Sequence, residues 1–306
     1  MFVSLRRVVS TAALVIASAA IPVQGPTSTA GAPPEDCAFL DAVSGSAVAA
    51  ARGGPGDARE PRGMAGEEVP AGSKRDPARF AVTVPTYFHV IRAGLKPEEG
   101  NLTDAQVDRQ MEVLNRAFAG RYGGAETGFR FDLVGVTRTT NAEWFAMGYQ
   151  SRAEHLAKSA LRQGDEGTLN IYSTDGADQT LLGWATFPSK NRGQPLRDGV
   201  VINHGSVPGG FIDGFNLGQT ATHEVGHWLG LYHTFQNRCS TTGDRVEDTP
   251  RQRVPTFGCP KGKDTCRQPG TDPIHNFMDY SDDSCYEEFT AGQATRMTEQ
   301  FLFYRS

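Results

Sequence analysis

The chain has 306 residues and a formal net charge of −5 at pH 7, so it is long enough to bury one large core or two lobes. The acidic balance excludes an extended basic surface of the kind that binds nucleic acid. With 35 glycines and 18 prolines, the composition is typical of a loop-rich secreted protein.

The N-terminus has the three parts of a secretory signal peptide. Arg6 and Arg7 supply the positive charge, residues 8–20 are mostly apolar, and Ala17-Ser18-Ala19 is an A-x-A cleavage site. The apolar run is shorter than the roughly eighteen residues that a membrane span needs, and the sequence contains no other run of that length. We therefore expect a signal peptide over residues 1–24 and a secreted, extracellular product without a membrane segment. An uncleaved membrane anchor is the alternative.

Residues 25–79 are rich in glycine, alanine, proline and charge and lack hydrophobic periodicity, so they cannot bury a core. We interpret them as a pro-segment or flexible lead, with candidate processing points at Lys74-Arg75 and Arg79. Cys37 is the one cysteine in this segment. Two interpretations stay open for it: an unpaired thiol without a role, or a zymogen switch whose thiolate blocks a metal site elsewhere in the chain.

Periodic apolar patterns begin near residue 80 and predict strands that alternate with helices. Runs of β-branched, aromatic or alternating apolar residues predict five strands, at residues 84–91, 129–133, 169–172, 181–187 and 200–203. Thr103 with Gln106, and Ser151 with Glu154, mark the starts of two amphipathic helices. The alternation predicts an α/β fold with a twisted, mostly parallel sheet. The short connection before residues 181–187 makes that strand a candidate antiparallel edge.

The most informative stretch is His223-Glu224-Val225-Gly226-His227, followed by Gly230 and His233. On a helix, His223 and His227 lie one turn apart on the same face, where two imidazoles can bind one zinc ion. Gly230 can end the helix in a left-handed turn that brings His233 back as a third ligand. Glu224 is offset around the helix and can take a proton from a water on the metal. The stretch therefore predicts one catalytic Zn²⁺ with Glu224 as general base.

The surroundings of this motif favour a buried helix. Asn216, with Gln219 three residues later, is expected to cap its start, and an apolar stripe lies on another face. The alternative is a polar surface helix whose histidines have no function. The remaining histidines lack ligand spacing, and we interpret them as structural or surface residues: His89, His155, His204 and His275.

After residue 233 the chain loses its periodicity, and four of its five cysteines follow, at positions 239, 259, 266 and 285. An even cluster in an exported chain predicts two disulfides, for which the sequence alone leaves three pairings. A cysteine-ligated zinc site is the alternative, but the spacings are not C-x-x-C. The loop of residues 242–250 offers hard oxygen ligands in Asp244, Asp248 and Thr249, so it is either a calcium site or a solvated acidic turn.

The run of residues 223–233 is the extended zinc signature of the metzincin metalloproteases. Asn276-Phe277-Met278-Asp279-Tyr280 resembles their methionine turn, with Met278 beneath the zinc site and Tyr280 facing the metal, where its hydroxyl could hydrogen-bond an oxyanion. Together with Asp248-Thr249-Pro250 and the placement of the four cysteines, these features make residues 80–306 resemble the pappalysin family, and its small secreted bacterial and fungal members in particular.

The resemblance implies a metzincin-like catalytic domain over residues 80–306, with a mixed five-stranded sheet. An upper lobe of about residues 80–233 would be followed by a lower lobe of about 234–306. It implies the disulfides Cys239–Cys266 and Cys259–Cys285, bracing an irregular C-terminal subdomain, and structural Ca²⁺ near the primed-side pocket. The edge strand would bind substrate through main-chain hydrogen bonds at Leu182, Gly183, Trp184 and Ala185.

The function that follows is a secreted zinc-dependent endopeptidase, expected to act as a monomer on protein or peptide substrates. Several members of the family cut before Arg or Lys, but Asp282 and Asp283 give no unambiguous pocket acid, so this preference stays open. Two rival classes remain: a secreted zinc hydrolase of non-peptide substrates, and a non-catalytic, zinc-stabilised binding protein. Glu224 argues against the binding protein, because a structural zinc site needs no base.

Overall fold

The computed structural model describes residues 39–40, 69, 80–176, 181–191 and 193–306. The signal peptide, most of the expected pro-segment and Cys37 lie outside this part of the chain. By their contacts, residues 34–306 group as one unit. No helix among the described residues is long and apolar enough to cross a membrane.

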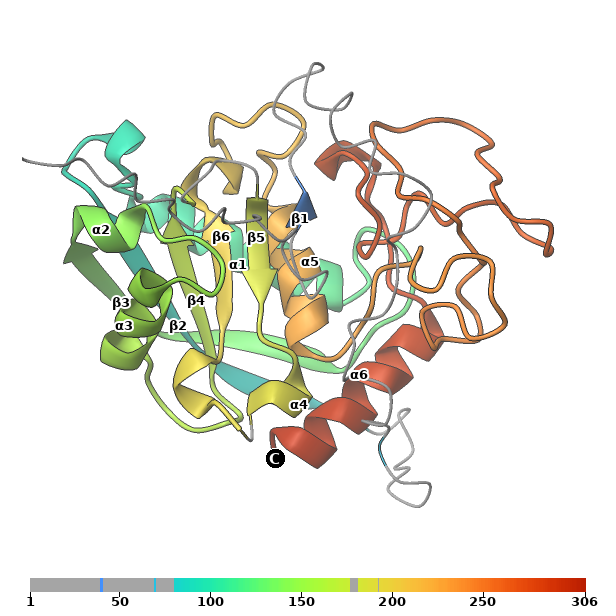
Figure 1. The fold of residues 1–306 in the computed structure, drawn as a ribbon, viewed down its shortest axis with the longest axis horizontal. Coiled ribbons are helices and arrows are strands. Elements are labelled where there is room, and N and C mark those ends of the chain that lie inside the picture. The colour runs from blue at the N-terminus through green and yellow to red at the C-terminus, as the bar shows by residue number, and fades with distance from the viewer. Residues whose placement is uncertain (1–38, 41–68, 70–79, 177–180, 192) are drawn as a thin grey trace, which may run out of the picture. The chain divides into compact units, whose positions relative to one another are not determined.

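The five predicted strands are all present and lie in one mixed sheet (Figure 1). They are β2 (Val82–Arg92), β3 (Phe129–Thr140), β4 (Leu169–Thr174), β5 (Leu181–Ala185) and β6 (Val200–Asn203). Neighbours in the order β3-β2-β4-β6 pair in parallel, and β5 pairs antiparallel with β6. The predicted antiparallel orientation of β5 is therefore confirmed.

A sixth strand completes the sheet and was not predicted. β1 (Phe39–Leu40) pairs antiparallel with β5, so that Phe39 lies opposite Gly183 and Leu40 opposite Leu181. It comes from the segment interpreted as a flexible lead. A strand of two residues carries no periodic signal, which is why the sequence pattern does not show it. The outer edge of β5 is consequently paired with β1 at Leu181 and Gly183.

Helices cover both faces of the sheet (Figure 1). On one face, α1 (Asp104–Phe118) and α5 (Gln219–Trp228) pack against the strands through a core that includes Leu114 and Val225. On the other face, α2 (Ala142–Phe145) and α3 (Arg152–Leu161) form a second core with Tyr172 and Trp184. The predicted α/β arrangement is confirmed. It holds α5 against β5 and β6, which is the contact that builds the site.

The C-terminal part is irregular, as the resemblance implied. Between α5 and α6 (Ala291–Tyr304), the described residues contain a single helical element, the 3₁₀ turn η6 (Asp283–Cys285). Two disulfides, Cys239–Cys266 and Cys259–Cys285, close loops within it. This is the expected pairing. The remaining short elements are η3 (Pro97–Glu99), α4 (Pro188–Asn191), η4 (Pro195–Arg197) and η5 (His204–Ser206).

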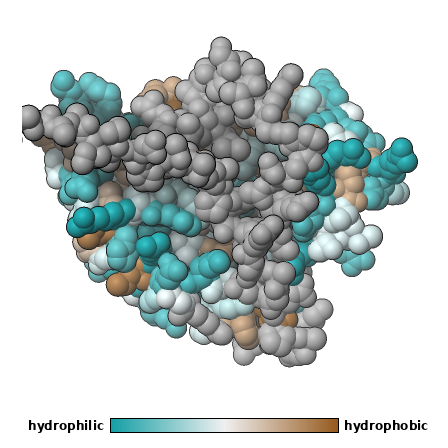
Figure 2. Space-filling view, in the orientation of Figure 1, coloured by the Kyte–Doolittle hydropathy of each residue, from teal (hydrophilic) through white to brown (hydrophobic). Residues whose placement is uncertain are grey.

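The surface of the described residues is mixed in polarity. On the face shown in Figure 2, hydrophilic residues dominate the coloured area and hydrophobic residues are scattered among them. The large hydrophobic side chains that are exposed, such as Leu95, Phe211 and Val254, come from separate segments. Isolated exposed apolar residues of this kind are normal for a protein surface.

Candidate metal centre and active site

Helix α5 begins at Gln219, after Gly218 in a left-handed conformation with φ of 93°, and no side chain of the neighbouring sequence caps it. The prediction that Asn216 caps this helix is therefore wrong: its side-chain amide donates to the Gly210 carbonyl instead. The cap comes from η6, since Asp283 Oδ2 accepts hydrogen bonds from the backbone N–H groups of Leu217 at 2.8 Å and Gln219 at 3.2 Å. A carboxylate at this position satisfies N–H groups that the helix leaves unpaired.

The end of α5 follows the sequence prediction. Gly230 has φ of 95°, so the chain turns sharply just after the helix. The turn is also crowded, because a β-carbon on Gly230 would lie 2.6 Å from Cγ of Gln300 in α6. Glycine meets both conditions. The turn directs the chain back so that His233 faces the two helical histidines.

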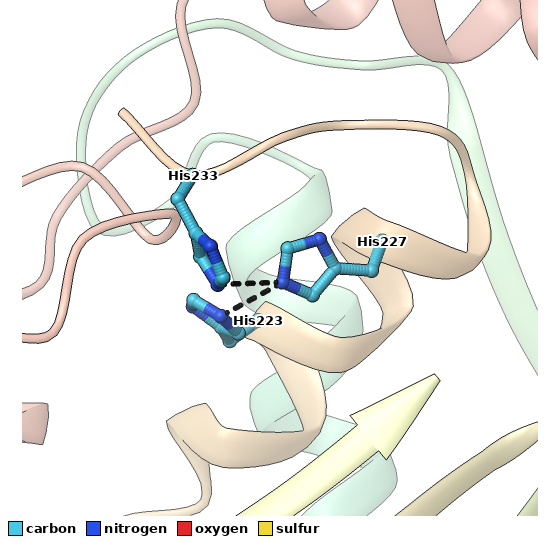
Figure 3. Close-up of side chains that lie close together, drawn as sticks. All are labelled: His223, His227 and His233. Atoms are coloured by element: carbon cyan, nitrogen blue, oxygen red, sulfur yellow. Dashed lines mark hydrogen bonds between the residues drawn. The ribbon is translucent and has the colours of Figure 1, made fainter. Parts of the chain in front are cut away.

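The three histidines converge on one point (Figure 3). Nε2 of His227 lies 3.1 Å from Nε2 of His223 and 3.0 Å from Nε2 of His233. Two of the rings are oriented through their other nitrogen, because Nδ1 of His223 donates to the Phe277 carbonyl and Nδ1 of His227 donates to the Leu231 carbonyl. A proton on Nδ1 leaves a lone pair on Nε2, so these lone pairs point at the common centre.

The electrostatics of this cluster suit a cation. Burial lowers the pKa of His227 to about 4 and places the pKa values of His223 and His233 well below the usual range. All three imidazoles are therefore neutral at pH 7, which is the form that binds metal. Lone pairs that face one another at this distance repel, and a positive ion between them removes the conflict. The donor set and its burial fit Zn²⁺.

Glu224 lies beside this cluster on the side of β5. It is fully buried, and neither carboxylate oxygen has a hydrogen-bond partner among the described residues. Burial raises the pKa of Glu224 well above its usual range, with Lys158 acting weakly in the opposite direction. A buried carboxylate without partners is costly. Its position therefore indicates a group that acts on something bound at the centre.

The predicted methionine turn lies directly beneath α5. Met278 is fully buried, and a β-carbon on Gly226 would lie 2.5 Å from its Sδ. The ring centroid of Tyr280 is 4.9 Å from that of His233 and 5.9 Å from that of His223. The structure therefore places Met278 beneath α5 and Tyr280 close to the histidine cluster, and the roles that the resemblance implies for them stay predictions.

The four β5 residues expected to bind substrate face different ways. Leu182 packs in a cluster that includes Tyr280, and Gly183 approaches Glu224. Trp184 belongs to the core on the α3 face, where its indole N–H donates to Glu154. Side chains thus alternate across the strand. The outer hydrogen-bonding edge of β5 is the feature that all four residues share, and β1 pairs with this edge at Leu181 and Gly183.

The three oxygen ligands expected for calcium have different environments. Asp244 and Thr249 are both buried and their side chains lie close together. Burial raises the pKa of Asp244 to about 7, while Thr249 and the Arg251 guanidinium act in the opposite direction. Asp248 instead binds the start of α6, where it accepts hydrogen bonds from the Thr290 hydroxyl at 2.7 Å and the Gly292 N–H at 2.8 Å. Asp248 is thus a tether for α6.

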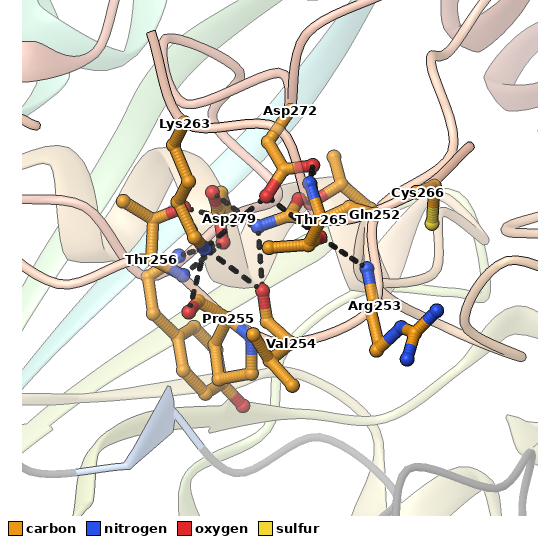
Figure 4. Close-up of polar contacts among 12 residues, drawn as sticks. Gln252, Arg253, Val254, Pro255, Thr256, Lys263, Thr265, Cys266, Asp272 and Asp279 are labelled. Atoms are coloured by element: carbon orange, nitrogen blue, oxygen red, sulfur yellow. Dashed lines mark hydrogen bonds and ion pairs between the residues drawn. The ribbon is translucent and has the colours of Figure 1, made fainter. Parts of the chain in front are cut away.

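A buried polar network holds the methionine turn, and no pattern in the sequence predicts it (Figure 4). Asp279 accepts hydrogen bonds from the N–H of Thr256 and from the side-chain amide of Gln252. Gln252 also accepts from the Thr234 hydroxyl, next to His233. The Lys263 ammonium donates to the Val254 and Pro255 carbonyls and to Thr256. The network therefore connects the third histidine with the methionine turn through loops that the disulfides close.

Comparison with known proteins agrees with this geometry. Residues 172–302 match the family described as "Pregnancy-associated plasma protein-A" among the M43 peptidases. The extracellular metalloprotease of Pyricularia oryzae is 46% identical over 228 residues, which cover 74% of this chain and 77% of that protein. The extracellular metalloprotease of Colletotrichum graminicola is 47% identical over 236 residues, covering 75% and 79%.

Solved structures give the same result. The structure described as mirolysin in complex with compound 9 aligns with a TM-score of 0.62 at 29% identity, over 72% of this chain and 92% of that chain. A Tannerella forsythia promirolysin mutant aligns with a TM-score of 0.64 at 27% identity, over 76% of this chain and 84% of that protein. The chain belongs to the pappalysin family of metzincin proteases and is a metalloendopeptidase hydrolase.

Proposed function

We propose that this protein is a secreted, zinc-dependent endopeptidase that uses Glu224 as its general base. The observation that supports this most is the convergence of three neutral histidine Nε2 atoms beside a buried carboxylate that has no hydrogen-bond partner in the described part of the chain. The ligands would be His223, His227 and His233. Relatives named as extracellular metalloproteases support both peptide hydrolysis and secretion, and they argue against the non-peptide and binding-protein alternatives.

Zinc bound at the three histidines would act as a Lewis acid that lowers the pKa of water and polarises the scissile carbonyl. Glu224 would take the proton of the attacking water and pass it to the leaving amine. For this the carboxylate must be ionised, and a nearby cation would oppose the rise in its pKa that burial causes. The Tyr280 hydroxyl would donate a hydrogen bond to the oxyanion, which the closeness of its ring to His233 supports.

We further propose that substrates bind along β5, at residues 182–185. The antiparallel pairing of β1 at Leu181 and Gly183 supports the proposal, because a substrate would pair with the same edge as an extended segment. A preference for Arg or Lys after the scissile bond also remains a proposal. Of the two acids considered for that pocket, Asp283 caps α5, which leaves Asp282.

The pro-segment of residues 25–79 and the signal peptide of residues 1–24 are kept as proposals for maturation. Cys37 lies two residues before β1 in the sequence, so the zymogen switch at the metal centre is the interpretation that we favour. N-terminal sequencing of the secreted Glu224→Gln protein tests self-processing. A fully trimmed N-terminus in that variant would exclude self-cleavage as the sole route.

Structural calcium at Asp244 and Thr249 is a further proposal, supported by two buried oxygen-bearing side chains that lie close together. Calcium should raise the melting temperature of the protein, and Asp244→Asn should remove that effect. An equal calcium effect in the variant would refute this site.

Hydrolysis of a mixed peptide library tests the proposed function. The protein should cleave the library, and a zinc chelator should stop cleavage, with mass spectrometry of the products giving the preference on each side of the bond. The Glu224→Gln variant should retain zinc and lose activity by orders of magnitude. Near-normal turnover by that variant would refute the assignment of the base.

A further inference from the structure

A cavity of about 220 Å³ lies at the C-terminal end of β5. It is lined by residues 184–187, by Glu154 of α3, and by Lys190 and Arg197 from the connection between β5 and β6. Phe187 joins the cavity to the histidine cluster, since its ring centroid is 5.4 Å from that of His227. The cavity is therefore adjacent to the candidate metal centre.

The side chains that line this cavity carry a net positive charge. Glu154 is already neutralised, because its Oε1 lies 2.7 Å from the ammonium of the buried Lys158 and accepts a hydrogen bond from the Trp184 indole at 2.7 Å. Lys190 is exposed and Arg197 is half-buried. Neither has an ion-pair partner among the described residues. Two uncompensated cations thus line the cavity and favour an anionic occupant.

The pairing of β1 gives the direction in which a bound segment runs. β1 is antiparallel to β5, with Phe39 opposite Gly183 and Leu40 opposite Leu181. Gly183 is the point where β5 contacts Glu224. In an antiparallel ladder, the residues that precede the one opposite Gly183 run past Ala185 toward the cavity. The register between β1 and β5 shifts between Phe39 and Leu40. Counted from Gly183 on the side away from that shift, at one residue per position, the cavity lies about two to four residues before the residue opposite Gly183.

We propose that this cavity is a substrate subsite for an acidic side chain, Asp or Glu, two to four residues before the scissile bond. Lys190 and Arg197 would bind the carboxylate. The inference rests on the proposed function, because it takes Glu224 to mark the scissile bond. The chain's own sequence agrees, since Glu35 and Asp36 lie four and three residues before Phe39.

Peptide binding to the full-length Glu224→Gln protein tests the subsite apart from turnover. Fluorescent peptides would be identical except for Glu or Gln at each of these positions. The Glu peptide should bind roughly three- to tenfold more tightly. The advantage should decrease with salt, because the cations are solvent-accessible. Any cost of displacing β1 from β5 is the same for both peptides, so it cancels from the ratio.

Charge-removing variants, each made in the Glu224→Gln protein, assign the effect to the cavity. Lys190→Gln and Arg197→Gln should each reduce the discrimination, and together they should abolish it. Arg152→Gln is the matched control, because Arg152 is an exposed cation of the neighbouring α3 that does not line the cavity. Equal binding of the Glu and Gln peptides at low salt would overturn the subsite.

Cleavage by the wild-type protein separates the subsite from the function on which it rests. The ratio of kcat/KM between Glu and Gln peptides should match the binding ratio. If the Glu peptide binds more tightly than the Gln peptide but no peptide is cleaved, the preference of the cavity is supported and only the endopeptidase proposal is overturned. If both peptides are cleaved with the same kcat/KM, only the subsite is overturned.

Discussion

Gly183 of β5 and Glu224 of α5 are in direct contact: a β-carbon added at Gly183 would lie 2.8 Å from Cγ of Glu224 and 2.8 Å from the Val201 carbonyl oxygen. Strand and helix can approach this closely because position 183 has no side chain. The contact positions the proposed general base relative to the strand that would bind the substrate. A small displacement of a catalytic group from its working position lowers the rate of the chemical step strongly.

Gly183→Ala should therefore lower kcat for peptide hydrolysis by about tenfold or more, because the added methyl group displaces Glu224. The zinc content should not change, since no histidine is touched. Gly193→Ala is the control: its added β-carbon would lie 3.9 Å from the Lys190 carbonyl oxygen, an ordinary contact, so activity should be kept. Activity of Gly183→Ala within twofold of the wild type would show that Glu224 does not need this contact.

The third histidine can be tested by metal content. His233→Ala leaves two imidazole ligands, so the protein should lose zinc during dialysis against a weak chelator, whereas the wild type should keep it. His155→Ala removes an exposed histidine of α3 and should retain zinc. Elemental analysis after dialysis measures both. Stoichiometric zinc in His233→Ala would mean that another residue supplies the third ligand.

Arg305, next to the C-terminal residue, anchors the end of α5. Its guanidinium forms two hydrogen bonds with Asp198, at 2.8 and 3.0 Å, and its Nε donates to the Trp228 carbonyl. The guanidinium carbon is 3.8 Å from the centroid of the Trp228 ring. Arg305 and Asp198 are both buried. Removing one partner leaves an uncompensated buried charge.

Arg305→Ala should thus lower the free energy of unfolding by about 3–5 kcal/mol, measured by urea denaturation. Replacing both partners, as in Arg305→Met with Asp198→Leu, should cost less than the sum of the two single changes, because neither charge is then left alone. Arg267→Ala, at an exposed position, should change the stability by less than about 0.5 kcal/mol. A loss under 1 kcal/mol in Arg305→Ala would contradict the anchoring role.

The parts of the fold that depend on local patterns were predicted well. Five strands, the capped helix α1 and the turn at Gly230 follow from apolar periodicity, a Thr–Gln capping box and a glycine. The histidine cluster follows because helical spacing fixes the positions of His223 and His227. These features need only residues that are close in the sequence.

The parts that depend on distant residues were missed. Asp283 caps α5 from 64 residues away, and Arg305 reaches Asp198 across 107 residues, so no window of sequence contains both partners. Asn216 was the local candidate for the cap, and it failed because its side chain binds Gly210. Long-range polar contacts leave no period in the sequence, and they become visible only when the fold brings their partners together.

The surroundings of Asp283, which caps α5, change the pKa of its carboxyl group in two opposite directions. Burial raises the pKa of Asp283 to about 7, and the N–H groups of Leu217 and Gln219 lower it. Asp282 raises it further, while the phenols of Tyr122 and Tyr286 face the same region. Because the net effect is a pKa above the usual aspartate value of 3.8, the folded protein binds this proton more tightly than the unfolded chain does.

The tighter binding of this proton stabilises the folded protein. This contribution to the free energy of unfolding is fully present below the pKa that Asp283 has in the unfolded chain, and it is lost as the pH rises through about 7. Asp283→Asn cannot titrate, so relative to that variant the wild type should lose on the order of a few kcal/mol of unfolding free energy between about pH 4 and pH 8. Urea denaturation at several pH values measures the difference. In Asp213→Asn, which changes an exposed carboxylate nearby, the free energy of unfolding should depend on pH in the same way as in the wild type. If the wild type instead gains stability over Asp283→Asn as the pH rises, the ionised carboxylate is the better cap, and the N–H groups at the start of α5 outweigh burial.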